Sequence, residues 1–334
     1  MQAKKEEKMQ ETVDILLTTY NTNIEYLKQQ IESILTQTYQ NFRLLISDDC
    51  SEKEEMRQVL EDYKKQDGRI ILYLQEKNLG YNKNFEFLLR QAKAKYIMFA
   101  DHDDIWYPQK VEKSVEKIEK EKVDLVYCNA NQINEKGEII KQDYFKYKNV
   151  PKIKGKNKLT LSRCIGIGCS QIITDNVKNK MIPFTDEVIA HDWLASFIAG
   201  EGKGLAYIEE PLFGYRLHQT NVFGGRNLTQ NLNMWKKENG KSYQSYLKYR
   251  KEKVIDKAYL DGAKMCKQYA QKKEDKKFLE ELIQYYENLE KSKYFNRNIR
   301  QYFKFLAGGN LAKKMAKEIM IFHLPIISYL IYLL

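Results

Sequence analysis

Three carboxylates within four residues follow directly on an apolar run, and no other stretch constrains the chain as much. Residues 96–99 are predicted to form a buried strand, and Asp101, Asp103 and Asp104 come right after it. A strand that ends in acids places them at the carboxyl edge of a sheet, where open α/β folds bind ligands. Such oxygen ligands suit Mg²⁺ or Mn²⁺, which would neutralise a diphosphate. The stretch predicts phosphate-ester chemistry, although alone it also fits a solvated acidic turn.

Apolar runs and amphipathic helices alternate along the first part of the chain. Apolar runs of strand length lie at residues 13–17, 42–46, 70–74, 96–99 and 125–128. Between the first two, Leu27 and Ile31 begin an apolar stripe at helical spacing. Strands and helices in alternation predict an α/β fold with a mostly parallel sheet and helices on both faces.

The regular alternation of predicted strands and helices ends after residue 130. Residues 134–137 predict a hairpin turn, and residues 146–158 form a polar, Lys-rich loop. Further strands are predicted at 170–173, 204–208 and 212–217, with a helix opening at Asp192. From residue 227 onward the pattern is helical. We expect a catalytic α/β domain at 12–226 and a basic helical region at 227–334.

The net positive charge of the chain lies entirely in the second of these regions. Residues 1–226 carry 34 Lys/Arg and 34 Asp/Glu, whereas residues 227–334 carry 22 and 11. Such an excess favours an anionic partner, whether a membrane surface, nucleic acid or an acidic polymer. No recognised nucleic-acid module is present. A solvated helical face and a partner-binding helical hairpin are the simpler interpretations.

The ends and the cysteines indicate the compartment. The five cysteines are widely spaced without a C-x-x-C pair, which predicts reduced thiols in the cytoplasm. The charged N-terminus has no apolar signal segment. Residues 319–334 are apolar but shorter than the about 20 residues that span a bilayer. With Lys313, Lys314 and Lys317 beside them, we expect this end to lie in the anionic inner face of the membrane.

Polar residues also follow the first two strands, at Thr18 and Asn21 and at Asp48 and Asp49. Carboxyl ends of parallel strands share one edge, so a nucleotide can lie across it. Asp49 could accept from the imide N–H of uracil or thymine, a donor that cytosine lacks. An Asx-turn or helix cap is the alternative for both acids. The chain has no Gly-rich phosphate loop, which disfavours dehydrogenases and P-loop enzymes.

Five motifs in order resemble family 2 glycosyltransferases of the GT-A fold, over roughly residues 12–225. The motifs are Thr18-Thr19-Tyr20-Asn21, Asp48-Asp49-Cys50-Ser51, Asn78-Leu79-Gly80, Asp101-His102-Asp103-Asp104-Ile105-Trp106 and His191-Asp192-Trp193. Within the family, residues 78–86 and the Asp-x-Asp-Asp-x-Trp form look like the rhamnosyltransferase branch. Two departures are His102 at the variable position and the missing Gln-x-x-Arg-Trp motif, which argues against a processive synthase.

The resemblance implies a nucleotide-sugar donor, a divalent metal and inversion at the anomeric carbon. It implies that Thr18 and Asp49 contact the base and that Asp103 is the direct metal ligand, with Asp101 on ribose or metal-bound water. Asp192 would be the general base. The other motif residues expected around the donor are Tyr20, Asn21, Asp48, Asn78, Gly80 and Asn84.

Other roles follow from residue chemistry. Asp192 opens a helix and can be a partly desolvated base or only a helix cap. Arg216 is a natural bidentate clamp for phosphate, and His218 can complete the metal shell or donate to the leaving diphosphate. We expect Trp106, Trp193 and His191 near sugar or acceptor, unless the tryptophans are core residues and the histidine only a support.

The predicted activity is transfer of L-rhamnose from dTDP-rhamnose to a growing, lipid-linked surface polysaccharide, with Mg²⁺ or Mn²⁺ as cofactor. A UDP-hexose or UDP-N-acetylhexosamine transferase of the same fold is the alternative, and a non-catalytic carbohydrate-binding protein is a more distant one. The expected location is the cytoplasm, peripheral on the inner face of the cell membrane. The C-terminal helices could instead serve a homo-oligomer.

Overall fold

A nine-stranded sheet forms the centre of the part that the structure describes. This computed structural model describes residues 11–148, 150–218 and 256–291, with a few single positions between 237 and 245. The strand order is β3-β2-β1-β4-β8-β6-β9-β5, and β7 pairs with β6. The strands are β1 (Val13–Thr19), β2 (Phe42–Asp48), β3 (Ile70–Leu74), β4 (Tyr96–Ala100), β5 (Ile105–Trp106), β6 (Leu125–Ile133), β7 (Ile139–Lys141), β8 (Gln171–Thr174) and β9 (Leu205–Arg216).

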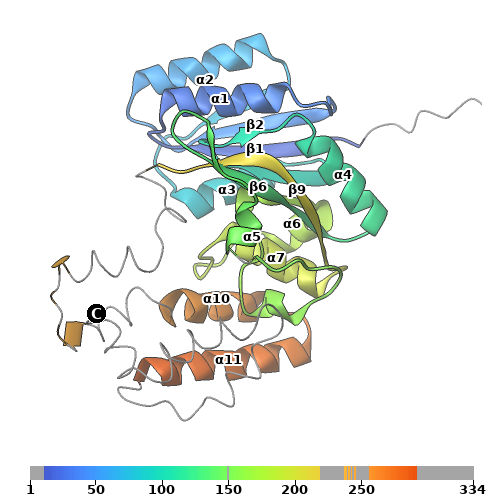
Figure 1. Cartoon of the computed structure of the whole chain (residues 1–334), viewed down its shortest axis with the longest axis vertical. Helices are drawn as coiled ribbons and strands as arrows, with labels where there is room; N and C mark the ends of the chain where they lie inside the picture. The colour runs from blue at the N-terminus through green and yellow to red at the C-terminus, as the bar shows by residue number, and fades with distance from the viewer. Residues whose placement is uncertain are drawn as a thin grey trace, which may run out of the picture.

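Helices cover both faces of this sheet. In Figure 1, α1 and α2 lie on one side of the sheet, whereas α3 and α7 lie on the other with α10 and α11 beyond them. The α-helices are α1 (Ile24–Leu35), α2 (Glu54–Gln66), α3 (Tyr81–Gln91), α4 (Lys110–Glu121), α5 (Tyr144–Lys148), α6 (Asp175–Met181), α7 (His191–Glu201), α10 (Asp256–Tyr269) and α11 (Lys273–Lys291). The predicted α/β architecture is confirmed.

The two halves of the sheet differ in strand direction. β1 pairs in parallel with β2 and β4, and β2 pairs in parallel with β3. β8 runs antiparallel to both β4 and β6, as the end of the regular alternation after residue 130 suggested. The two strands predicted at 204–208 and 212–217 are one strand, β9, whose register against β6 shifts between Cys128 and Asn131. A register shift of this kind lets one long strand stay paired with a bent neighbouring strand.

The register of the parallel strands brings their polar ends together. Thr19 pairs with Asp48 across β1 and β2, and Leu17 pairs with Ala100 across β1 and β4. The residues that follow β1, β2 and β4 therefore emerge at one edge of the sheet. The short strand β5 then pairs antiparallel with β9, Ile105 opposite Gly214, and returns the end of β9 to the acidic loop.

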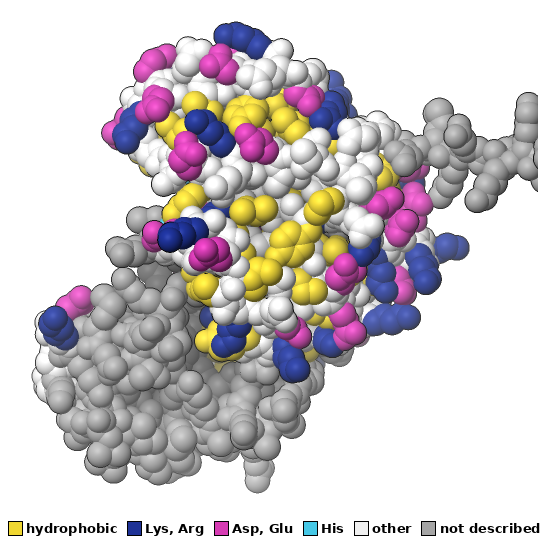
Figure 2. Space-filling view, turned by 45° about the horizontal axis from the view of Figure 1, so that its top comes forward, with side chains coloured by type: hydrophobic (Ala, Val, Ile, Leu, Met, Phe, Trp, Pro, Cys, Tyr) yellow, Lys and Arg dark blue, Asp and Glu magenta, His cyan; other side chains and the backbone are white. Residues whose placement is uncertain are grey.

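The described surface mixes charges of both signs. On the face in Figure 2, Lys and Arg side chains alternate with Asp and Glu side chains around the described part. Among the described residues, no helix combines the length and the apolar character that crossing a membrane requires. The predicted membrane-associating end at 319–334, with Lys313, Lys314 and Lys317, lies outside the described residues.

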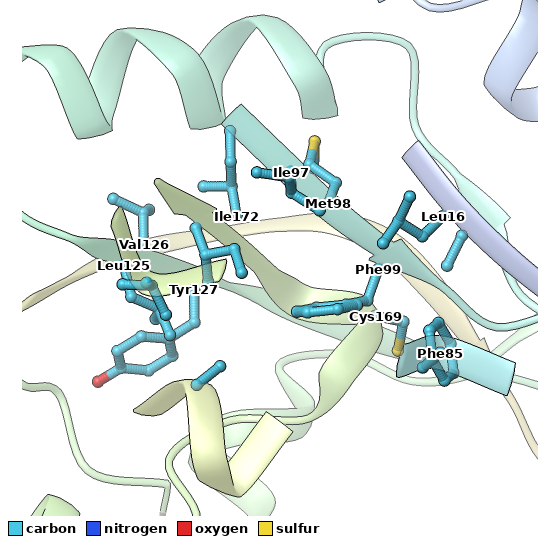
Figure 3. Packing of buried hydrophobic residues seen from close by; sticks show 14 of the residues in the cluster. Leu16, Phe85, Ile97, Met98, Phe99, Leu125, Val126, Tyr127, Cys169 and Ile172 are labelled. Carbon is cyan, nitrogen blue, oxygen red and sulfur yellow. The ribbon is translucent and has the colours of Figure 1, made fainter. Parts of the chain in front are cut away.

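The core is built from strand side chains packed under the helices. Phe99 on β4, Phe85 on α3 and Cys169 lie close together, as Figure 3 shows, and all three are 0% exposed. The rings of Phe85 and Phe99 meet edge to face, with centroids 5.7 Å apart. This cluster lies directly beneath the acidic edge and supports it from inside.

The start of β1 carries a buried carboxylate. Asp14 is 0% exposed, and its Oδ1 and Oδ2 accept from Nε (2.8 Å) and Nη2 (2.7 Å) of Arg43 on β2. Its Oδ2 also accepts from the backbone N–H groups of Lys93 and Ala94, at 2.6 and 2.8 Å. Asp14 thus joins β1, β2 and the α3–β4 connection, and it was not singled out from the sequence.

The C-terminal helices pack against α7. A Cβ atom added to Gly262 on α10 would lie 2.2 Å from the Trp193 ring, so the backbone of α10 lies directly on this indole. The ring of Tyr259 meets it edge on. The Tyr269 hydroxyl accepts from Thr185 N and donates to Pro183 O, each at 2.9 Å. These contacts fix α10 beside the helix that begins at His191.

We expect Asp14→Ala to lower the free energy of unfolding by about 3 kcal/mol, because it leaves the Arg43 guanidinium and two backbone N–H groups without their acceptor. Urea denaturation followed by circular dichroism measures the change. Asp62→Ala is the control, since Asp62 is about half exposed and its Oδ1 meets two surface side chains, Lys65 Nζ at 3.4 Å and Gln58 Nε2 at 2.8 Å. The control should stay within about 0.5 kcal/mol of the parent. Equal losses in both variants would refute the role of Asp14.

Candidate active site

The acids after β4 have different environments although they are neighbours in sequence. Asp103 reaches across to the end of β9, where its Oδ2 lies 2.6 Å from Nε2 of His218. Burial raises the pKa of Asp103, but the hydrogen bond with His218 and the nearby His102 and His218 rings together outweigh burial, so the pKa lies below its usual value. The His218 ring also lies 5.7 Å from the ring of Tyr26 on α1. Asp103 is therefore the acid of this loop that is held as a carboxylate.

Asp101 and Asp104 lie in a drier environment. With Cys169 they form a group whose potential ligand atoms all lie within 4.8 Å of one another. Burial, together with the charges of Asp103 and Asp192, raises the pKa of Asp101 to about 7. Burial and the charges of Asp103 and Asp101 raise the pKa of Asp104 well above its usual value. Oδ2 of Asp104 is buried without a hydrogen-bond partner.

These donors fit a divalent cation in chemistry. Carboxylate oxygens are the ligands that Mg²⁺ and Mn²⁺ prefer, and neutral imidazole is a common metal ligand. Of the predicted metal ligands, the structure brings Asp103 and His218 into contact, and Asp101 lies in the adjacent acidic group. The unpartnered Oδ2 of Asp104 is a further oxygen at this position.

Arg216 holds the loop together instead of facing a ligand. The side chain is 0% exposed, and its Nε donates to Asp103 O at 2.6 Å. Nη1 donates to the backbone oxygens of Asn134 and Glu135, at 3.1 and 2.8 Å, and Nη2 donates to Gln29 Oε1 at 2.6 Å. The predicted phosphate clamp is thus corrected, because the guanidinium is buried against protein acceptors.

The two acids after β2 organise the adjacent turns. Asp48 is 0% exposed and accepts from Thr19 Oγ1 (2.8 Å), Ser51 N (2.8 Å) and Ser51 Oγ (2.6 Å). It forms the Asx-type turn that was the alternative to donor binding, which corrects that prediction. The Asp49 carboxylate is 3% exposed and accepts from the N–H groups of Leu79 and Gly80, at 2.7 and 2.9 Å. Asp49 therefore joins the end of β2 to the loop before α3.

The loop after β1 lies at the same edge. Asn21 has a positive φ of 47°, and its Oδ1 accepts from Glu52 N at 3.0 Å. Tyr20 is 46% exposed beside it, whereas Thr18 is buried and its backbone bonds with the His102 ring. This loop offers an exposed aromatic ring next to the end of β2.

The loop before α3 contributes backbone groups. Asn78 is exposed, and Gly80 precedes α3 with φ 81°, a conformation that only glycine adopts without strain. Asn84, predicted near the donor, is 1% exposed. Its Oδ1 accepts from Ser47 Oγ at 2.6 Å and its Nδ2 donates to Ser47 O at 3.1 Å. Asn84 is corrected to a buried brace between α3 and β2.

Asp192 is partly exposed in the first turn of α7, as the sequence predicted for this helix start. Its Oδ1 accepts from Trp193 N at 2.8 Å. Its charge contributes to the raised pKa of Asp101, so the two carboxylates are within electrostatic reach. The structure therefore places an acid from α7 beside the acids that follow β4.

The aromatic residues predicted to face a sugar are core residues. Trp106 is 2% exposed, and Nζ of Lys110 lies 3.6 Å from its ring centroid. Trp193 is 6% exposed beneath α10. His191 is 1% exposed and stacks on Phe85 with ring centroids 4.1 Å apart. The three stacking predictions are corrected, because none of these rings has an open face.

Two residues of the site lie outside the sequence predictions. Lys110 is 0% exposed and donates to Cys169 O, and burial lowers the pKa of its ammonium group. Cys169 lies in the turn Gly168–Ser170 against the acids, and burial raises the pKa of its thiol well above the usual value. In the sequence, Lys110 reads as a surface residue at a helix start and Cys169 as an ordinary thiol. Only the apolar neighbours Trp106 and Val111 hinted that Lys110 is enclosed.

Comparison with known proteins gives consistent matches. The sequence model of glycosyl transferase family 2 matches residues 14–178. An uncharacterized glycosyltransferase from Methanocaldococcus jannaschii is 30% identical over 209 residues, which is 61% of this chain and 70% of that protein. WfgD of Escherichia coli, named UDP-Glc:alpha-D-GlcNAc-diphosphoundecaprenol beta-1,3-glucosyltransferase, is 30% identical over 188 residues, 55% of this chain and 68% of that protein.

The fold also has counterparts among solved structures. Residues 1–349 of S. aureus TarS, in complex with UDP-GlcNAc, superpose with a TM-score of 0.56 and 14% identity. The match covers 93% of this chain and 81% of that chain. At this identity the likeness concerns the fold alone, and it confirms the predicted GT-A architecture.

The buried imidazole of His191 predicts a pH-dependent stability. Burial lowers its pKa to about 4, and neither ring nitrogen has a hydrogen-bond partner. The unfolded chain, with the usual pKa of about 6.5, binds more protons between these values, so stability falls as the pH drops from 7 towards 4. We expect this group to remove about 2 kcal/mol by pH 5.

Urea denaturation at pH 7 and pH 5, in the parent and in His191→Phe, measures this contribution. Phenylalanine keeps the stack on Phe85 and cannot titrate, so the variant should lose less stability than the parent on acidification. Equal pH dependence in the two proteins would show that His191 is protonated at pH 5 as readily in the folded state as in the unfolded chain.

Proposed function

Because this chain belongs to glycosyl transferase family 2, we propose that it moves a sugar from a nucleotide-diphosphate donor to a glycan acceptor carried on a lipid. The chain is a glycosyltransferase, and the donor, the acceptor and the residue roles are our proposals. The observation that supports them is the contact of Asp103, after β4, with His218, after β9, while the charge of Asp192 on α7 reaches the neighbouring Asp101. We propose that residues 12–226 form the catalytic unit and that 227–334 are accessory to it.

Asp192 is the proposed general base. It is partly exposed, and one oxygen is held by Trp193 N at 2.8 Å, so the other oxygen can accept a proton from an acceptor hydroxyl. The hydroxyl oxygen then forms a bond to the anomeric carbon while the bond from that carbon to the diphosphate oxygen breaks. The proton remains on the Asp192 carboxyl group. Attack opposite the leaving group inverts the anomeric configuration.

The other acids serve the departing nucleotide. Asp103 and His218 are the proposed holders of Mg²⁺ or Mn²⁺, with Asp101 beside them. When bound, the cation would neutralise the negative charge that develops on the diphosphate. Arg216 holds this pair in place, because its Nε donates a hydrogen bond to Asp103 O.

A pyrimidine nucleotide is the proposed donor, with its base at the ends of β1 and β2. The proposed contacts are Thr18, Tyr20 and Asn21 from the end of β1 and the loop after it, with Asp49, Asn78 and Gly80 from the loops after β2 and before α3. The motif at residues 78–86 supports dTDP-rhamnose. The name of the relative WfgD supports UDP-glucose as a second candidate. Both donors carry an imide N–H, which can donate a hydrogen bond to a carboxylate such as that of Asp49.

A lipid-linked acceptor makes the cytoplasmic face of the membrane the proposed place of action. The name of WfgD states a diphosphoundecaprenol acceptor for that protein, and the positive charge of 227–334 supports attraction to anionic lipids. Self-association through the C-terminal helices stays a prediction.

Asp192→Asn should reduce turnover by roughly 10²–10⁴-fold, because the amide cannot take the acceptor proton. Donor binding and the thermal midpoint should stay near those of the parent. Initial rates of nucleotide release with acceptor and equilibrium binding of donor measure the two properties separately.

Asp186→Asn is the matched control, since Asp186 is an exposed carboxylate five residues before α7 begins. It should leave the rate unchanged. A destabilised Asp192→Asn variant that keeps full turnover would mean that Asp192 only caps the helix.

Nucleotide and metal requirements are tested together by thermal shift. With Mn²⁺ present, UDP or dTDP at about a hundred times its dissociation constant should raise the midpoint by roughly 5–10 °C, and GDP should raise it less. EDTA should remove most of the shift and abolish transfer.

Product analysis with UDP-glucose and dTDP-rhamnose then distinguishes the two candidate sugars. Full transfer in EDTA, or a preference for GDP, would contradict the proposed roles of Asp103 and Asp49 respectively.

A further inference from the structure

The strand β7, which forms a hairpin with β6, presents apolar side chains to solvent. β7 pairs with the end of β6, Ile133 opposite Ile139. Ile139 is 51% exposed and Ile140 is 55% exposed. Neighbouring side chains of a strand point to opposite faces, so neither face of β7 is covered there. Two adjacent exposed isoleucines on this strand indicate a surface that meets an apolar environment.

The adjoining helix α5 extends this surface. Tyr144 and Phe145 are buried and anchor the helix, whereas Tyr147 is 44% exposed. Nζ of Lys141, on β7, lies 3.3 Å from the centroid of the Tyr147 ring, and Nζ of Lys148 lies 5.5 Å from it. Hairpin and helix therefore form one continuous surface. We call it the hairpin surface, and its residues are Ile139, Ile140, Lys141, Lys146, Tyr147 and Lys148.

The charge around the hairpin surface has one sign. Residues 141–158 contain seven lysines and one acid, Asp143. The Asp143 carboxylate accepts from Asn129 Nδ2 and Lys146 N, at 2.7 and 3.1 Å. Lys152 and Lys154 pair with Glu209 and Glu121.

Four further lysines of this segment face solvent without a carboxylate partner among the described residues. Within the described chain, no ion pair involves the exposed residues Lys141, Lys146, Lys148 and Lys156.

We propose that the hairpin surface docks on an anionic phospholipid membrane. The two isoleucines would enter the boundary of the acyl chains, Tyr147 would lie at the level of the headgroups, and the lysines would meet lipid phosphates. This is the distribution of side chains that interfacial membrane binding requires. A membrane is favoured over an acidic protein or polymer because paired exposed aliphatics gain little from a hydrated polyanion.

The hairpin is fastened to the proposed site. Arg216 donates to the backbone oxygens of Asn134 and Glu135 in the hairpin turn and also to Asp103 O. A Cβ atom on Gly137 in the same turn would lie 3.2 Å from the Ile105 side chain. Docking by this hairpin would therefore bring the membrane close to the acidic loop. The proposal rests on the proposed function in this respect, since a lipid-linked acceptor is presented at such a surface.

Flotation of the full-length chain with phosphatidylcholine vesicles, with and without phosphatidylglycerol at low salt, tests the proposal. The double variant Ile139→Glu/Ile140→Glu should bind the anionic vesicles roughly tenfold more weakly or worse, and Lys141→Gln/Lys146→Gln/Lys148→Gln should show a comparable loss. Leu74→Glu is the matched control, because Leu74 is 38% exposed at the end of β3 and should bind as the parent does.

Thermal midpoints equal to that of the parent verify that the hairpin variants are folded. Parental vesicle binding by both hairpin variants would overturn the proposal and assign any binding to another part of the chain. Loss of self-association in the double variant, by analytical ultracentrifugation, with vesicle binding unchanged would assign the surface to a second copy instead.

Enzyme assays separate this proposal from the proposed function. The hairpin variants should retain donor hydrolysis in water and lose transfer to a lipid-linked acceptor in anionic vesicles. If the parent shows no transfer from any donor but still binds vesicles through the hairpin, the proposed function fails and the docking surface stands.

Discussion

The buried guanidinium of Arg216 is the interaction on which the site depends. Its donors meet the backbone of the acidic loop, the turn of the β6–β7 hairpin and α1. These segments are far apart in sequence, and each presents oxygen atoms that would be costly to bury alone. One planar cation with several fixed donors satisfies them together. The acids after β4 therefore face a defined direction instead of forming a mobile turn.

The same loop separates two kinds of acid. Asp103 has the His218 imidazole as a partner, which keeps its pKa below the usual value. Asp101 and Asp104 lack such a partner, and burial raises their pKa values. Adjacent carboxylates whose pKa values shift in opposite directions are typical of functional sites, because negative charges so close together cannot all be stabilised equally. A bound cation would remove this imbalance, which supports the proposed role of the loop.

The site is assembled from three layers of the molecule. The parallel strands bring the ends of β1, β2 and β4 to one edge, β9 returns His218 to it, and α7 adds Asp192 from the opposite face. The contact of Gly262 with Trp193 connects α7 to the C-terminal helices. The hairpin surface adds the proposed membrane contact to the same edge, so donor, acceptor and membrane would meet around one loop.

The sequence alone determined the elements and the edge. Apolar periodicity indicated the strands of the sheet's first half, and acids directly after them placed a polar edge. Motif order indicated the family and the helix that begins with His191 and Asp192. These features are local, since strand and helix patterns repeat over a few residues. Tertiary structure alone decided which polar groups face inward. His218 meets Asp103 across 115 residues, Arg216 and Asn84 are buried braces, and Trp106 and Trp193 are covered. Such outcomes depend on packing between distant segments, and a side chain's own sequence neighbours carry no record of that packing.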